Sequence, residues 1–291
     1  MTNTFLRWAG SKKWLARMID DVLPQGFEGI DTFVEPFAGG ASMSFAISSK
    51  KNIEHIILND MNDELITAFL MLKSSPDKVV SELSKMADEY VKLDDAKQKD
   101  YYYSVRSSFN SCEFEDHAMR AAQFIFLNKT CWNGLWRVNS DGVFNTPAGF
   151  MPRVICDKEG LMECSKALEK ASFSNGCYED MLEYAGPKTM YYLDPPYMPL
   201  KGDGFTAYTK SGFTADDHAN LKRFCDEAAA RGSKVLVSNS GTLDADGEYY
   251  FAKLYAGWHV KEMNASRRIN SDTGGRQPVK ELLISNYELK I

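Results

Sequence analysis

The N-terminal part of the chain alternates short apolar runs with a glycine-rich turn. Residues 30–35 form an apolar run that predicts a buried strand, and this run leads into Pro36-Phe37-Ala38-Gly39-Gly40. A helical pattern follows over residues 41–48, and a second apolar run at residues 55–58 ends at Asn59-Asp60. Strand, glycine loop, helix and strand in this order indicate the beginning of a parallel sheet of the α/β class.

From about residue 63 to residue 168 the apolar positions follow a helical period instead. These positions are Leu65, Phe69, Leu72, Val79, Leu83, Met86 and Tyr90. Another helix is expected over residues 116–128. A turn-rich piece with Asn133-Gly134 and Asn139-Ser140-Asp141-Gly142, flanked by aromatic residues, predicts a hairpin. We interpret residues 64–168 as an inserted, mainly helical subdomain.

Strand patterns return in the C-terminal part, at residues 172–175, 190–193, 234–238, 258–263 and 281–287. Between them, residues 214–231 have the period of an amphipathic helix, with Thr214 as its N-cap and Gly232 as its end. The predicted fold class is therefore α/β, with a core formed by residues 1–63 and 169–291 around the insert.

The composition is that of an ordinary globular protein and excludes few functions. The chain of 291 residues has a formal net charge of −6, which taken alone argues weakly against a polyanionic partner. Arginines and lysines nevertheless occur in loops at residues 7–13, 129–153 and 267–276. Because phosphates meet a local face rather than the total charge, a nucleic-acid partner stays open.

Cysteines, histidines and the apolar runs argue against several other classes. The six cysteines form no CxxC pair and the four histidines are scattered, so we expect neither a metal site nor a disulfide framework. No apolar run reaches the length of a membrane span, and the N-terminal residues have no apolar signal core. We therefore expect a cytoplasmic protein without a membrane partner.

The strongest chemical signal is Asp194-Pro195-Pro196-Tyr197, directly after the apolar strand at residues 190–193. Two prolines cannot continue a β-ladder, so the chain leaves the sheet at the strand end where α/β proteins bind ligands. The Asp194 carboxylate and the Pro195 carbonyl can each accept one N–H of a conjugated amine, such as N6 of adenine, while Tyr197 stacks on the ring. The alternative is a strand-ending turn that buries a tyrosine.

The loop that contains Phe37 and Gly39 is a second, weaker signal. Glycines after the first strand let the backbone approach a ligand closely, although a plain tight turn is the alternative. Asp60 ends the next strand, about 20 residues past the glycines, where an acid can hold ribose hydroxyls. A nicotinamide dehydrogenase would suit this arrangement equally, but hydride transfer does not call for the tetrad that begins at Asp194.

The third signal is Arg7-Trp8-Ala9-Gly10-Ser11-Lys12, where a tryptophan and a small-residue turn precede a lysine at a helix start. Helix N-termini attract anionic groups, and Lys12 is available there for a carboxylate. The alternative is a Trp8 packed into the core and a solvated Lys12.

Together these signals resemble the Dam-type family of adenine-N6 DNA methyltransferases, in order and over almost the whole chain. The matching pieces are Phe5-Leu6-Arg7-Trp8-Ala9-Gly10-Ser11-Lys12, Val34-Glu35-Pro36-Phe37-Ala38-Gly39-Gly40, Asn59-Asp60-Met61-Asn62, Leu127-Asn128-Lys129, Asn133-Gly134-Leu135-Trp136-Arg137-Val138-Asn139, Phe144-Asn145-Thr146-Pro147, the tetrad Asp194 to Tyr197, Phe205-Thr206-Ala207-Tyr208 and Gly274-Gly275-Arg276. The resemblance implies a Rossmann-like methyltransferase core, with the insert as the target-recognition subdomain.

The resemblance implies that S-adenosyl-L-methionine is the cofactor. Trp8, Lys12, Asp60 and Asp194 are expected to contact it, and Phe37 to pack near its methionine part. The other residues expected at this site are Ala9, Gly10, Glu35, Pro36 and Gly39.

The resemblance also implies double-stranded DNA as the partner. Trp132 falls where the family has a tyrosine that wedges into the duplex, and an indole can fill the space left by an extruded base. Arg137 matches an arginine that reads guanine through O6 and N7. The alternatives are a core tryptophan for Trp132, and a phosphate contact or a solvated side chain for Arg137.

Four further positions complete the expected DNA contacts, together with Arg7. Leu135 and Pro147 match positions near base edges, with ordinary hairpin packing as the alternative. Asn133 and Arg276 lie in matching pieces as well. Arg7 replaces the lysine common at its position and can still bind a base or a phosphate.

A second departure concerns the target sequence. After Pro147 the best-known members of the family have an aromatic residue, a glycine and an arginine, whereas this chain has Ala148-Gly149-Phe150-Met151-Pro152-Arg153. A GATC-like site is still the expected target.

The sequence thus predicts a monomeric, site-specific enzyme that methylates N6 of a flipped-out adenine in DNA. An RNA or protein amide N-methyltransferase with the same tetrad is the alternative, since both substrates offer a planar conjugated nitrogen. A catalytically silent DNA-binding module is a third possibility, and the intact tetrad and glycine loop argue against it.

Overall fold

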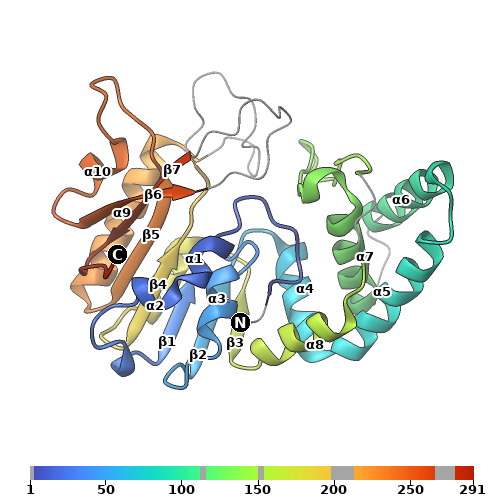
Figure 1. Ribbon diagram of the computed structural model, residues 1–291, viewed down its shortest axis with the longest axis horizontal. Helices are drawn as coiled ribbons and strands as arrows, with labels where there is room; N and C mark the ends of the chain where they lie inside the picture. Colours follow the sequence, from blue (N-terminus) through green and yellow to red (C-terminus); the bar gives the residue numbers. More distant parts are fainter. Residues whose placement is uncertain (1–2, 112–115, 150–153, 198–212, 266–278) are drawn as a thin grey trace.

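The computed structural model describes residues 3–111, 116–149, 154–197, 213–265 and 279–291, and seven strands in these ranges form one sheet (Figure 1). The strand order is β3-β2-β1-β4-β5-β7-β6. The strands are β1 (Thr32–Glu35), β2 (His55–Asn59), β3 (Ala171–Ser174), β4 (Thr189–Leu193), β5 (Lys234–Ser240), β6 (His259–Ala265) and β7 (Val279–Ser285). The strands from β3 to β5 run parallel, and β7 is antiparallel to both β5 and β6.

Helices cover both faces of the sheet, because successive side chains of each strand point to opposite sides. Phe33 and Tyr192 join the hydrophobic cluster that includes α1 (Lys13–Arg17) and α3 (Ser42–Ile47). Val34 and Tyr191 join the cluster beneath α9 (Ala215–Ala230) and α10 (Tyr250–Leu254). The helices and 3-10 turns that the structure describes before β2 and after β3 are α1, α2 (Ile19–Val22), η1 (Phe27–Gly29), α3, η3 (Tyr178–Tyr184), α9 and α10.

Among the described residues between β2 and β3, five helices gather beyond the β3 edge of the sheet (Figure 1). They are α4 (Asp63–Ser74), α5 (Pro76–Tyr90), α6 (Asp95–Asn110), α7 (His117–Thr130) and α8 (Lys158–Ala167), with the short turn η2 (Trp132–Gly134) after α7. The helix α4 joins this group to the sheet, since Phe69 stacks on Phe173 of β3 with ring centroids 6.1 Å apart.

The predicted α/β class is correct, and every predicted strand is present with ends shifted by at most two residues. The helix predicted after Thr214 is also present: the Thr214 side chain caps it with Asp217, and Gly232 follows its end with a φ of 97°. The predicted hairpin is less regular than expected. It contains η2 and two isolated antiparallel bridges, Cys131↔Ala148 and Val138↔Phe144.

No helix in the described ranges is both long and apolar enough to cross a membrane. Among the same residues, no group of three or more histidine, cysteine or acidic side chains is placed to hold a metal ion.

Candidate active site

Two of the carboxylates predicted for the site, Glu35 and Asp194, lie at the carboxyl ends of β1 and β4. These two strands are parallel neighbours, with Val34 beside Tyr191, and the chain runs from β1 toward β3 on one side and from β4 toward β5 on the other. In an open α/β sheet, ligands bind at this point where the strand order reverses. Glu35 ends β1 and Asp194 follows β4, so both carboxylates lie at this switch point.

The Asp194 carboxylate is held by two side chains from other parts of the chain. Lys12 Nζ donates to both of its oxygens at 2.9 Å, and Ser238 Oγ donates to Oδ1 at 3.0 Å. Lys12 is only 4% exposed, which contradicts the solvated lysine considered as an alternative. Burial acts to lower the pKa of Lys12, but the nearby Asp194, Tyr197 and Glu281 outweigh it and raise this pKa.

The rest of the tetrad lies against this ion pair. The Lys12 ammonium sits 5.0 Å from the centroid of the Tyr197 ring, a cation–π distance. Burial, followed by the negative charge of Asp194, raises the pKa of Tyr197, so its hydroxyl stays protonated at neutral pH. The tetrad therefore presents a carboxylate beside a neutral aromatic ring.

The glycine loop and Asp60 form one hydrogen-bonded unit. Gly39 N donates to Asp60 Oδ2 at 2.9 Å, and Asn62 N donates to Asp60 Oδ1 at 3.0 Å. Asn59 adds a second link, because its carbonyl accepts from Ala38 N at 2.8 Å. Burial raises the pKa of Asp60, against the opposing effect of the two backbone donors.

Glu35 takes a different environment from the other two carboxylates. It is buried, and its Oε2 accepts hydrogen bonds from Ser44 N at 3.1 Å and from Ser44 Oγ, in the first turn of α3. Burial raises the pKa of Glu35 to about 8, although the bonds from Ser44 oppose the shift. Glu35 thus anchors the start of α3 to the glycine loop.

Trp8 packs on the glycine loop. A Cβ at Gly39 would lie 2.9 Å from the indole Nε1, and one at Gly40 would lie 3.0 Å from Trp8 Cβ. Gly39 also has a φ of +46°, so glycine is required here for both space and backbone conformation. Ala9, Gly10 and Pro36 lie in the same two segments, and Ser11 Oγ is 2.8 Å from Ser42 Oγ of α3.

Phe37 lies in a small aromatic group on the α9 side of the sheet. Its ring centroid is 5.2 Å from that of Tyr178 and 6.0 Å from that of Phe213. No sequence motif points to Tyr178 or Phe213, because each is an isolated aromatic residue.

The loop after α7, which is expected to contact DNA, is linked by hydrogen bonds to the N-terminal segment at Arg7. Asn128 lies at the end of α7 and is 0% exposed; its Oδ1 accepts from Arg7 N, and its Nδ2 donates to Arg7 O, both at 2.8 Å. The same Nδ2 donates to Gly134 O at 3.3 Å, so one amide joins the N-terminal segment to the loop after α7. Lys129 lies close by, and burial, Lys13 and Arg7 lower its pKa.

Some side chains on this loop are exposed to solvent, and others are fixed by hydrogen bonds or partly buried. Trp132 is 42% exposed, which argues against a core tryptophan, and Asn133 and Pro147 are exposed as well. Arg137 is held by Asn145, whose Oδ1 accepts from Nε at 2.7 Å and whose carbonyl accepts from Nη2 at 3.3 Å. Leu135 is half-buried, whereas Arg276 lies outside the described residues.

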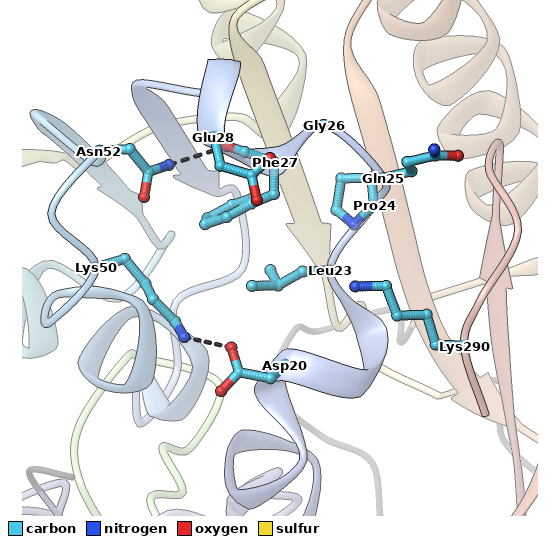
Figure 2. A pocket seen from close by; sticks show the side chains of 10 residues that line it. All are labelled: Asp20, Leu23, Pro24, Gln25, Gly26, Phe27, Glu28, Lys50, Asn52 and Lys290. Atoms are coloured by element: carbon cyan, nitrogen blue, oxygen red, sulfur yellow. Dashed lines mark hydrogen bonds and ion pairs between the residues drawn. The ribbon is translucent and has the colours of Figure 1, made fainter.

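A separate hollow of about 660 Å³ is lined by none of the site residues described above (Figure 2). Most of its lining comes from the segments that precede β1 and β2, at the amino-terminal ends of these strands, and Lys290 after β7 completes it. Lys50 pairs with Asp20 there, and Asn52 donates to the Phe27 carbonyl at 3.0 Å (Figure 2). The Lys50, Asp20 and Asn52 side chains thus serve the protein's own contacts.

The mixed α/β architecture, with a seven-stranded sheet and acidic groups at its switch point, is consistent with a methyltransferase. The family of D12 class N6 adenine-specific DNA methyltransferases matches the chain over residues 8–269. A type II methyltransferase, M.MjaIII of Methanocaldococcus jannaschii, is 39% identical over 97% of this chain and 98% of its own length. The DNA adenine methylases of Vibrio cholerae and Escherichia coli are 31% and 32% identical, over 96% of this chain and 94% and 93% of their own lengths.

The chain therefore belongs to the D12 class of N6 adenine-specific DNA methyltransferases. It is an enzyme that methylates adenine in DNA at N6, as predicted, and this result decides against the RNA or protein amide alternative and the silent binding module.

Proposed function

We propose that Asp194, Pro195, Pro196 and Tyr197 carry out methyl transfer to a flipped-out adenine of double-stranded DNA, in a GATC-like site. The observation that carries this proposal is the Asp194 carboxylate at the sheet's switch point, held by Lys12 and Ser238 beside the Tyr197 ring. A carboxylate fixed in this way has a defined direction in which to accept an N–H.

The tetrad would act on the adenine amine by hydrogen bonding. Asp194 accepts one N6–H, and the Pro195 carbonyl accepts the other, which localises the nitrogen lone pair and stabilises the positive charge that develops on nitrogen. Tyr197 stacks on the base and orients it. The methyl donor would be left as a neutral thioether, and the methylated nitrogen, now strongly acidic, would lose one proton to solvent water.

The residues around the tetrad suit S-adenosyl-L-methionine, which supplies an electrophilic methyl group. The donor set is acidic, with the Asp60 and Asp194 carboxylates at the ends of β2 and β4, and such groups can hold ribose hydroxyls and a cationic ligand. Trp8, Lys12 and Phe37 would complete the binding site. Ala9, Gly10, Glu35, Pro36 and Gly39 would line it.

DNA recognition is proposed for residues 64–168, with the catalytic core in residues 1–63 and 169–291. Trp132 is exposed and able to fill the space of an extruded base, and Arg137 keeps three of its five N–H groups outside the bonds to Asn145. The other proposed DNA contacts are Arg7, Asn133, Leu135, Pro147 and Arg276. We propose that the enzyme acts as a monomer.

Substitution of Asp194 tests the catalytic assignment. Asp194→Ala should lower the methylation rate at least about 100-fold while DNA binding survives, because the carboxylate orients N6 rather than the duplex. Asp194→Asn keeps an acceptor oxygen but loses the charge, so it should retain little activity. Transfer of a tritiated methyl group to DNA measures the rate, with Asp216→Ala, an exposed acid in the first turn of α9, as the control. Wild-type turnover in Asp194→Ala would contradict the assignment.

A further inference from the structure

Ser238 lies on β5, beside the strand that carries the tetrad. The strands β4 and β5 are parallel neighbours, with Leu193 beside Val237, so Ser238 stands next to Asp194. Its side chain is 0% exposed and donates to Asp194 Oδ1 at 3.0 Å. A buried hydroxyl aimed at a carboxylate is a strong, charge-assisted hydrogen bond.

Tyr192 extends this contact one step further into the core. Its hydroxyl is 2.9 Å from Ser238 Oγ, and the residue is 1% exposed. A serine hydroxyl has only one hydrogen, and that hydrogen goes to Asp194. Tyr192 must therefore be the donor to Ser238, which gives a directed chain from Tyr192 through Ser238 to Asp194.

This chain of hydrogen bonds makes the two carboxylate oxygens of Asp194 unequal. Oδ1 accepts from both Ser238 and Lys12, whereas Oδ2 accepts from Lys12 alone among the described residues. Oδ2 thus keeps more acceptor capacity for an incoming N–H, and the bond from Ser238 prevents the carboxylate from exchanging its oxygens by rotation.

We propose that Ser238 and Tyr192 are positioning residues that orient the Asp194 carboxylate so that Oδ2 faces the adenine amine. The proposal rests on the proposed function of Asp194. A misplaced catalytic group lowers the rate of the chemical step without weakening DNA binding. Substitutions of Ser238 and Tyr192 should therefore lower kcat and leave the KM for DNA unchanged.

Three variants and one matched control test the hydrogen-bond chain from Tyr192 through Ser238 to Asp194. Ser238→Ala should lower kcat about tenfold or more with an unchanged KM for DNA, and Tyr192→Phe about threefold, since it acts only through Ser238. In the double variant, the tyrosine change should add nothing to the loss in kcat. Tyr191→Phe is the control, because Tyr191 is a buried neighbour on the same strand whose hydroxyl donates to the Met181 carbonyl on the opposite face.

Thermal stability separates positioning from a general structural role. Ser238→Ala leaves the Tyr192 hydroxyl buried without its acceptor, so it should lower the melting temperature, and adding Tyr192→Phe should recover part of that loss but none of the lost kcat. Control-like kcat values in Ser238→Ala and Tyr192→Phe would overturn the proposal. So would independent, multiplicative losses in the double variant, or kcat losses that disappear as stability is recovered. If Asp194→Ala itself stays active, the proposed function fails first, whatever these variants do.

Discussion

At the residue scale, Asp60 is the side chain whose proposed role is easiest to measure. Asp60→Ala removes a charge-assisted acceptor for a ribose hydroxyl, so it should weaken the binding of S-adenosylmethionine by about 1.5–3 kcal/mol. Calorimetric titration measures the dissociation constant, and Asp63→Ala, an exposed acid in the first turn of α4, is the control. An unchanged constant would mean that Asp60 only holds the loop through Gly39 and Asn62.

His218 is a second residue with a measurable consequence. Its ring is buried between Phe213 and Phe251, at 4.6 and 4.7 Å between centroids, and burial lowers its pKa to about 4, against the opposing charge of Asp217. The unfolded chain takes up this proton below about pH 6.5, whereas the folded protein does so only near pH 4. The stability that neutral His218 contributes is therefore complete above pH 6.5 and is lost as the pH falls toward 4.

Chemical denaturation at two pH values tests this linkage. Between pH 7 and pH 5, wild-type protein should lose about 2 kcal/mol of unfolding free energy through His218, in addition to the contributions of other groups. His218→Met has no titrating ring and should lose correspondingly less over the same interval. Equal losses in the two proteins would show that His218 does not resist protonation.

The sequence predicted the acidic and aromatic members of the site, but not what holds them. Asp194, Lys12 and Asp60 each belong to a short motif whose chemistry can be interpreted alone. Ser238 and Tyr192 belong to ordinary apolar strands, and only the parallel register of β4 and β5 gives them a role. The ion pair between Lys12 and Asp194 likewise joins residues far apart in the chain, which local patterns do not connect.

At the scale of elements, the N-terminal segment and the loop after α7 act as one unit. Asn128→Ala would leave the amide and carbonyl of Arg7 and the carbonyl of Gly134 without their partner, at a cost of about 2 kcal/mol or more in unfolding free energy. DNA affinity should fall as well, because this amide fixes Arg7 against the loop. Denaturation and DNA titration measure both effects.

A matched control substitution tests whether these effects are specific to Asn128. Asn220→Ala makes the same chemical change on α9, on the opposite face of the sheet, and should alter neither quantity. Cofactor affinity in Asn128→Ala should change less than DNA affinity, since the hydrogen bonds of the Asn128 side chain go to Arg7 and Gly134 rather than to Asp60 or the glycine loop. A variant that is destabilised but binds DNA normally would contradict the coupling of the two segments.

Some elements were predicted poorly because their form depends on distant partners. The segment after α7 has the turn residues of a hairpin. However, Tyr102 and Arg106 of α6 donate hydrogen bonds to the Thr146 carbonyl, and the Asn110 side chain pairs with the backbone of Phe144. These side chains satisfy backbone groups that a regular ladder would otherwise pair. The strand β7 was predicted as a strand, but its antiparallel place between β5 and β6 follows from pairing that local patterns do not contain.

At the scale of the whole molecule, Asn128 of α7 binds the backbone of Arg7, which directly precedes Trp8 of the candidate active site, so target choice can be tested through activity. Arg137 is the residue for this test. If it reads a guanine through two hydrogen bonds, Arg137→Ala should lose about 1–3 kcal/mol of discrimination at one base position. Methylation rates on GATC and on sites substituted one pair at a time measure that loss.

The same substrates at two salt concentrations distinguish base reading from a phosphate contact. Loss of a phosphate contact should slow all sites alike and lower the salt slope by about one unit, since one fewer counterion is released. Arg223→Ala, an exposed arginine on α9, is the control for a lost charge. A uniform fall would make Arg137 a backbone contact and direct attention to residues 148–153, where the chain departs from its family. Equal rates on GATC and on unrelated adenines in the wild-type enzyme would refute the proposed target.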